Sequence, residues 1–164
     1  MEHLWTPWRS TYITAANKGE TACIFCAAAA QDNDEQTLVV HRAQHCFVIL
    51  NRYPYTNGHL MIAPYAHVSR LNEASEQAVH ELTDLARDAE RVLEETYNPD
   101  GLNLGMNLGR AAGAGIAEHI HMHMLPRWNG DANFMTTIAS TRIIPEALSD
   151  TYTKLKKAFS KVSD

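Results

Sequence analysis

The residues best suited to chemistry are His119, His121 and His123, which occupy every second position of one stretch. Successive side chains of a β-strand point to opposite faces, so this spacing predicts three imidazoles on one face. The apolar residues between them would then face a core behind the sheet. Imidazoles titrate near neutral pH, so such a cluster suits nucleophilic attack, proton transfer or metal binding.

Three interpretations of this histidine cluster are open. A purely structural role is disfavoured, because each ring would need its own hydrogen-bond partners. Metal-assisted hydrolysis would place two rings on one zinc, but the neighbouring acid, Glu118, should point to the opposite face of the strand. Nucleophilic catalysis fits best, with one imidazole attacking phosphorus while its neighbours set the tautomer and handle protons.

A second candidate site is the pair Cys23 and Cys26, which two residues separate. Two thiolates at this spacing can bind one zinc from a tight turn, and histidines elsewhere would have to supply the other two ligands. A redox pair and two unliganded thiols are the alternatives. The chain has three cysteines, an odd number that argues against a secreted disulfide framework and favours zinc.

A glycine-rich loop leads directly into the histidine stretch. Gly109, Gly113 and Gly115 let backbone N–H groups approach a ligand closely, and successive N–H groups in a turn can bind an anion. Any phosphate held there would lie beside the imidazoles. Asn51 ends an apolar run at a loop, where it could either contact a ligand or simply form the turn.

The elements that must position these residues follow from periodicity. Strand-like runs cover residues 37–41, 46–50 and 59–64, and a fourth begins at Gly101, which suggests an antiparallel meander. Between them, an amphipathic helix of roughly 20 residues begins after Asn72 or Ser75 and stops at Asn98-Pro99. A second helix covers residues 145–161. The acidic stretch 31–36 is expected to be an exposed loop.

Length and charge limit the remaining possibilities. The 164 residues suit a single domain over 1–164, with an aromatic N-terminal arm at residues 1–20 that covers the core or binds a base or a subunit. The net charge of −5 gives no field that favours nucleic acid or an anionic membrane. No apolar run is long enough to span a membrane and no signal pattern opens the chain, so we expect a cytoplasmic protein.

The motif His119-Ile-His-Met-His123-Met-Leu resembles that of the histidine triad family, and the resemblance extends over roughly residues 20–135. Residues 47–67 look like the family's strand, turn and Gly-His strand, and residues 107–119 like its phosphate loop. The resemblance implies an α+β fold with a five-stranded antiparallel sheet, a long helix and a C-terminal helix. It also implies a homodimer, or a higher homo-oligomer, built on a ten-stranded sheet.

The resemblance further implies a role for each site residue. His121 matches the nucleophile that takes the α-phosphate as a nucleotidyl-histidine, and His123 the residue that contacts the phosphate and assists the leaving group. Asn51 matches a ribose contact and His59 a partner of the triad. The phosphate loop would comprise Asn107, Gly113, Ala114 and Gly115.

In relatives that carry a Cys-x-x-Cys pair, zinc is held by that pair, a later histidine and the first triad histidine. Those positions are Cys23, Cys26, His67 and His119 in this chain. Because four protein ligands close the coordination shell, the resemblance implies a structural zinc.

One departure from the family pattern bears on the reaction. Many members carry Gly-Gln-Ser/Thr just before the triad, where this chain has Gly113-Ala114-Gly115-Ile116-Ala117. The sequence is similar to the bacterial diadenosine tetraphosphate phosphorylases, in which inorganic phosphate receives the adenylyl group and yields ADP and ATP. A dinucleoside polyphosphate hydrolase and a nucleotide-binding protein without turnover are the alternatives.

Overall fold

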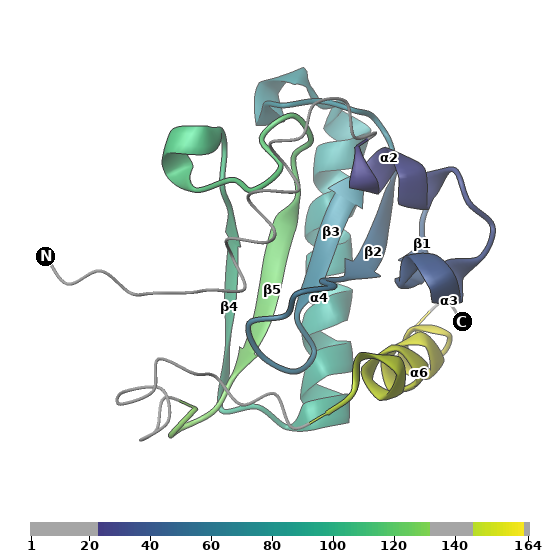
Figure 1. Ribbon diagram of the computed structural model, residues 1–164, viewed down its shortest axis with the longest axis vertical. Helices are drawn as coiled ribbons and strands as arrows, with labels where there is room; N and C mark the ends of the chain where they lie inside the picture. The colour runs from purple at the N-terminus through teal and green to yellow at the C-terminus, as the bar shows by residue number, and fades with distance from the viewer. Residues whose placement is uncertain (1–22, 132–145, 163–164) are drawn as a thin grey trace, which may run out of the picture.

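A computed structural model describes residues 23–131 and 146–162 of the chain. Its centre is a five-stranded antiparallel sheet in the order β1-β2-β3-β5-β4 (Figure 1). The strands are β1 (Val39–Arg42), β2 (Cys46–Leu50), β3 (Leu60–Pro64), β4 (Gly101–Met106) and β5 (Met122–Arg127). The predicted α+β class and five-stranded sheet are confirmed.

The two faces of the sheet carry separate apolar clusters. Every residue of β2 is buried, and the strand's alternation sends Val48 to one face and Phe47 to the other. The first face packs on α4 (Glu76–Tyr97) and α6 (Leu148–Phe159), whose Leu85 and Leu155 are buried against it. The opposite face packs on α2 (Ile24–Ala29) through Phe25. All histidine chemistry described below lies on this α2 face.

The long helix α4 agrees with the sequence prediction. Its 22 residues bury a stripe at three- and four-residue spacing. Ser75 caps the first turn by accepting the backbone N–H of Ala78 at 3.2 Å. Asn98 ends the helix in the left-handed region, with φ of 44°. Cys46 of β2 lies beneath this helix, fully buried, with its Sγ 3.4 Å from the carbonyl oxygen of Ala78.

The β2–β3 loop, residues 51–58, closes tightly against the long helix. Gly58 has φ of +71°, and an added Cβ there would lie 3.0 Å from Tyr97 and 3.2 Å from Leu93. Glycine is therefore needed both for its backbone conformation and for lack of space. This close approach fixes the end of the β2–β3 loop, directly before His59 and β3.

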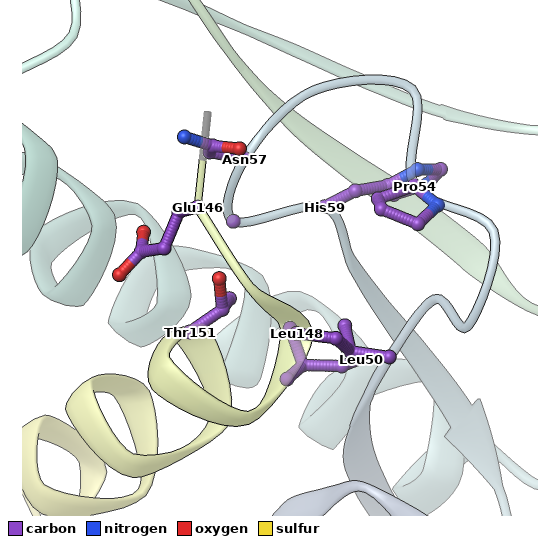
Figure 2. Close-up of a pocket in the computed structure, with 8 residues that line it drawn as sticks. Leu50, Pro54, Asn57, His59, Glu146, Leu148 and Thr151 are labelled. Atoms are coloured by element: carbon purple, nitrogen blue, oxygen red, sulfur yellow. The ribbon is translucent and has the colours of Figure 1, made fainter. Parts of the chain in front are cut away.

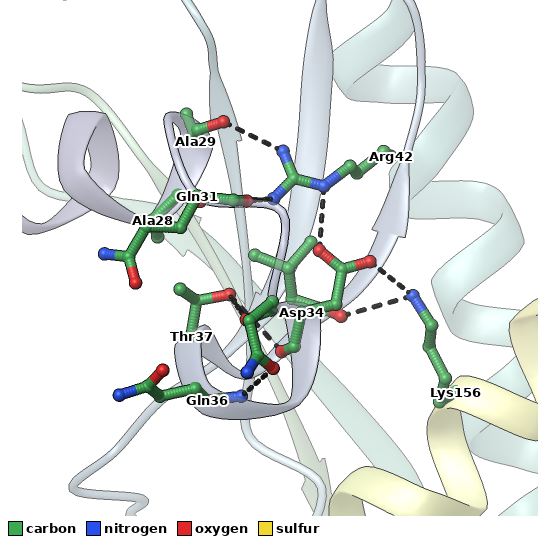
Figure 3. Close-up of polar contacts among 10 residues, drawn as sticks. Ala28, Ala29, Gln31, Asp34, Gln36, Thr37, Arg42 and Lys156 are labelled. Atoms are coloured by element: carbon green, nitrogen blue, oxygen red, sulfur yellow. Dashed lines mark hydrogen bonds and ion pairs between the residues drawn. The ribbon is translucent and has the colours of Figure 1, made fainter.

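The acidic stretch is not entirely a loop, which corrects the prediction for residues 31–36. Helix α3 (Asp34–Thr37) begins there, because the side chain of Asn33 accepts the N–H of Gln36 at 3.1 Å. Asp34 pairs with Arg42 at 2.8 Å and with Lys156 of α6 at 2.7 Å (Figure 3). The ion pair of Lys156 with Asp34 thus ties α6 to α3.

Three other boundaries differ from the predictions. Cys23 and Cys26 lie at the start of helix α2 rather than in a tight turn. Strand β5 begins only at Met122, so two of the three histidines precede it. Helix α6 begins at Leu148 instead of residue 145. The aromatic arm at residues 1–20 lies outside the described residues.

Two further features concern the periphery of the molecule. Strand β4 forms one edge of the sheet, and most of its residues are exposed. Within residues 23–131 and 146–162, no helix is long and apolar enough to cross a membrane.

Candidate active site and metal centre

Four ligand atoms converge at one end of α2. The side chains of Cys23, Cys26, His67 and His119 bring one ligand atom each to within 4.8 Å of one another. Nδ1 of His119 lies 3.3 Å from Sγ of Cys23, and Nδ1 of His67 lies 3.2 Å from Sγ of Cys26. Zinc bonds of about 2.3 Å to sulfur and about 2.0 Å to nitrogen place tetrahedral ligands roughly 3.5 Å apart. Both the spacing and the donor set therefore fit zinc.

The surroundings of this cluster prepare it for a cation. Nε2 of His119 is 2.9 Å from the carbonyl oxygen of Pro64, which can only accept, so Nε2 carries the proton. The Nδ1 lone pair of His119 is then directed at the thiols, as a metal ligand requires. Burial, together with the hydrogen bond and charge of Cys23, raises the pKa of Cys26. A bound cation would counter that effect by stabilising both thiolates.

The second triad histidine has a defined tautomer. Nδ1 of His121 lies 2.9 Å from the carbonyl oxygen of His119, so Nδ1 must donate and Nε2 is left with its lone pair. Only 5% of His121 is exposed. This burial lowers its pKa more than the hydrogen bond to His119 raises it. The ring is therefore neutral at pH 7, and its free Nε2 is the atom available for nucleophilic attack.

The third triad histidine is oriented from the β2–β3 loop. The backbone N–H of Tyr55 donates to Nδ1 of His59 at 3.2 Å, so the proton of His59 is on Nε2. That Nε2 lies 2.9 Å from Nδ1 of His123 and donates to it, which leaves the proton of His123 on its own Nε2. Burial lowers the pKa of His59 to about 3 and that of His123 to about 4. His123 can therefore donate a hydrogen bond from its Nε2, whereas His121 presents a lone pair on its own Nε2.

The shared face predicted for the triad is supported by the sheet register. His123 pairs with Met61, whose side chain belongs to the cluster on the α2 face. Met122 and Met124 belong to the α4 face, as the alternation predicts. The rings of His121 and His123 are 4.8 Å apart between centroids and nearly perpendicular, at 74°. Alternation thus brings the two rings together although His121 precedes the strand.

The predicted phosphate loop connects β4 to the triad. It contains a short 3-10 turn, Arg110–Ala112, and Arg110 pairs with Glu118 at 3.8 Å. The N–H groups of Gly113 and Ala114 donate within the loop, at 3.0 and 3.3 Å. Both N–H groups are already used inside the turn, so they could bind a phosphate only if the turn opened. A phosphate bound to the loop in this conformation would have to contact other residues of the loop.

Asn51 does form the turn that was one of its two predicted roles. Its side-chain oxygen accepts the N–H of Tyr53 at 2.9 Å, and its amide nitrogen lies 3.3 Å from Nδ1 of His59. The ribose contact remains a prediction. Asn51 therefore helps to hold the loop that orients His59.

A small cavity lies between the β2–β3 loop and the start of α6 (Figure 2). Its volume is about 20 Å³, and Asn57, His59, Glu146 and Thr151 contribute to its lining. That space suits about one water molecule and is far too small for a nucleotide.

Sequence reasoning missed three groups that define the site. Phe25 contacts two triad rings, the carbonyl of Pro64 orients His119, and the N–H of Tyr55 orients His59. Two of these groups are backbone atoms, which no residue type reveals. Phe25 could have been noticed from its place between the two cysteines.

Comparisons with known proteins agree with this geometry. The family model described as "HIT domain" matches residues 32–130. A Mycobacterium tuberculosis protein named AP-4-A phosphorylase is 40% identical over 157 residues, which cover 92% of this chain and 80% of that protein.

Two solved structures extend the comparison. A zinc-bound histidine triad family protein from Mycobacterium smegmatis superimposes with a TM-score of 0.70 and 26% identity, covering 87% of this chain and 96% of that one. A HIT family member from Bacillus subtilis gives a TM-score of 0.60 and 25% identity over 87% of this chain and 96% of its own.

Proposed function

Because this chain belongs to the histidine triad family and is an enzyme of that family, we propose that it cleaves dinucleoside polyphosphates through a nucleotidyl-histidine intermediate on His121. The match to the family model and the 40% identity to the Mycobacterium tuberculosis protein confirm the family resemblance seen in the sequence. The observation that carries the proposal is the buried, neutral imidazole of His121, whose Nδ1 donates to the carbonyl of His119 and whose Nε2 keeps its lone pair. Such a ring is already in the form that attacks phosphorus.

With diadenosine tetraphosphate, the first step divides the substrate into AMP and ATP parts. Nε2 of His121 attacks the α-phosphorus, and the bond from that phosphorus to the bridging oxygen breaks. The bridging oxygen leaves as the terminal oxygen of ATP. His123 can donate a hydrogen bond from its Nε2–H to this oxygen and so stabilise the charge that develops on it. The adenylyl group is then bonded to His121.

In the second step an acceptor oxygen attacks the same phosphorus and the bond to His121 breaks. We propose inorganic phosphate as the acceptor, so that ADP forms and the second product remains ATP. The support is the 40% identity to a protein named AP-4-A phosphorylase, together with the absence of Gln and Ser/Thr before the triad. A hydrolase, with water as the acceptor, is the alternative and would release AMP.

Product analysis distinguishes the two reactions. Diadenosine tetraphosphate is incubated with the full chain, with and without phosphate, and the nucleotides are separated. We expect ADP and ATP in equal amounts with phosphate and little turnover without it. AMP and ATP formed without phosphate would identify the hydrolase, and tight AMP binding with no products would identify a nucleotide-binding protein.

A variant tests the intermediate itself. His121→Asn should reduce turnover by about 10⁴-fold or more, because no ring nitrogen remains to attack phosphorus. His80→Asn is the matched control, since His80 is exposed on α4. Turnover retained by His121→Asn would remove His121 as the nucleophile.

The four-residue cluster is proposed as a zinc site with a structural role. Cys23, Cys26, His67 and His119 would supply all four ligands, leaving no position for substrate. Zinc there would hold α2 against the segments that carry His67 and His119. No proton transfer or bond breakage is assigned to it.

Two molecules are proposed to pair through β4. Among residues 23–131 and 146–162, this strand has one sheet neighbour, β5, so within that part of the chain its other edge is not paired. Leu104 is 56% exposed on this strand and Leu108 beyond it is 37% exposed, an apolar surface typical of an interface. Antiparallel pairing of two copies would give the ten-stranded sheet that the sequence resemblance implies.

A further inference from the structure

One aromatic ring links the two halves of the site. Phe25 stands between Cys23 and Cys26 on α2, and none of its surface is exposed. Its ring centroid is 5.2 Å from that of His119 and 4.8 Å from that of His121. The same side chain therefore contacts one histidine of the metal cluster and the histidine proposed to attack phosphorus.

The helix that carries Phe25 is fixed at both ends. At its start the cysteines face His67 and His119. At its end Arg42 donates to the carbonyl oxygens of Ala28, Ala29 and Gln31, at 3.2, 3.0 and 2.7 Å (Figure 3). The guanidinium is a rigid fork, so these three bonds set the direction of α2 as well as its distance from the sheet. The position of the Phe25 ring is therefore fixed by contacts at both ends.

His121 needs such a neighbour. Within the described residues its side chain makes one hydrogen bond, from Nδ1 to the carbonyl of His119, which fixes the position of Nδ1 but allows the ring plane to swing about that bond. Such a swing would move the reactive Nε2 off the line of attack. Phe25 lies against the ring at an angle of 37°, while His123 meets it nearly edge-on. These two rings restrict the swing.

We propose that Phe25 is a positioning residue, which holds the imidazole of His121 so that Nε2 points at the α-phosphorus. The inference rests on the proposed function, because it requires His121 to be the nucleophile. Helix α2 would then serve both sites, because the helix that carries the cysteines would also orient the reacting ring of His121.

The test compares two phenylalanines in the metal-loaded full chain. Phe25→Leu should lower kcat and the rate of adenylyl-enzyme formation by about 10- to 100-fold, because a misplaced group loses much of its rate enhancement. KM should change by less than about twofold, since Phe25 is not proposed to contact the nucleotide.

Phe47→Leu is the matched control. Phe47 is also fully buried in the cluster on the α2 face, but its ring stacks on Tyr65, at 5.3 Å, and not on the triad. Both variants should lose similar thermal stability, because each removes part of one buried aromatic ring. Only Phe25→Leu should lose kcat.

A spectroscopic measurement separates positioning from general damage. The ring current of Phe25 should displace the imidazole proton resonances of His121, and this displacement should disappear in Phe25→Leu but persist in Phe47→Leu. Equal losses of kcat in the two variants would overturn the inference while leaving the proposed function intact. Loss of bound metal from Phe25→Leu in proportion to its activity would also overturn it. Turnover by His121→Asn would instead remove the function on which it rests.

Discussion

Each imidazole of the triad has a hydrogen-bond partner that fixes which of its two ring nitrogens carries the proton. Carbonyl oxygens set His119 and His121 in opposite tautomers, and a backbone N–H acting through His59 sets His123. Alternation along the chain predicted the common face of the three rings. It could not predict the tautomers, because the partners come from residues that lie far away in the sequence and act through backbone atoms. The three rings are therefore chemically distinct even before a nucleotide binds.

The neutral state of these rings makes stability depend on pH. The pKa of His59 is about 3 and that of His123 about 4, whereas an unfolded histidine has a pKa near 6.5. Between those values the unfolded chain binds protons that the folded chain does not, so acid favours unfolding. The stability that these two rings contribute is fully present above about pH 6.5 and is lost as the pH falls, towards about 4 for His123 and towards about 3 for His59.

Urea unfolding between pH 7.5 and 5 measures this effect. Each ring should steepen the dependence of the free energy of unfolding by up to about 1.4 kcal/mol per pH unit. His123→Gln should reduce the slope, and His80→Gln, at an exposed position of α4, should leave it unchanged. Identical slopes for the two variants would contradict the neutral assignment of His123.

At the scale of elements, periodicity predicted the parts of the fold that bury long, regular faces. The sheet strands and α4 were recognisable because their apolar residues repeat with a constant period. The short helices α2 and α3 were missed. Six and four residues are too few to show a period, and distant contacts of Arg42 and a cap by Asn33 decide their conformation.

Metal removal tests the proposed dependence of α2 on zinc. With an excess of chelator, activity should decline slowly and in parallel with the loss of the native far-ultraviolet dichroism signal, because a structural metal stabilises the fold rather than the reaction. The two time courses are recorded on the same sample. Immediate loss of activity from a protein that remains folded would assign the metal a direct part in the chemistry.

At the scale of the molecule, the sheet is unequally protected at its two edges. Strand β1 lies beside α6 and α3, whereas β4 forms the outer edge of the sheet (Figure 1). Leu104 on β4 and Leu108 just beyond it are exposed. The sequence indicated β4 as an alternating strand, but its exposure followed only from the strand order. That order depends on β5 entering between β3 and β4. Pairing of two copies at this edge would bury the exposed leucines.

Light scattering after size exclusion tests this pairing. The unmodified chain should have the mass of two copies, and Leu104→Lys should have the mass of one, because a buried lysine without a partner is costly. Leu71→Lys is the control, since Leu71 is 39% exposed on a short 3-10 helix (Leu71–Glu73) outside the sheet. A monomeric unmodified chain, or two variants with the same mass, would contradict an interface at β4.

The burial of Cys46 separates the three thiols by reactivity. Burial raises its pKa to about 12, and the side chain has no exposed surface beneath α4, so alkylating reagents cannot reach a thiolate there. Cys23 and Cys26 are partly exposed. Zinc would shield them from alkylation, and its loss would leave both open to labelling. The number of labelled thiols per folded chain would therefore measure the fraction of chains that lack zinc, and the buried Cys46 would not add to that number.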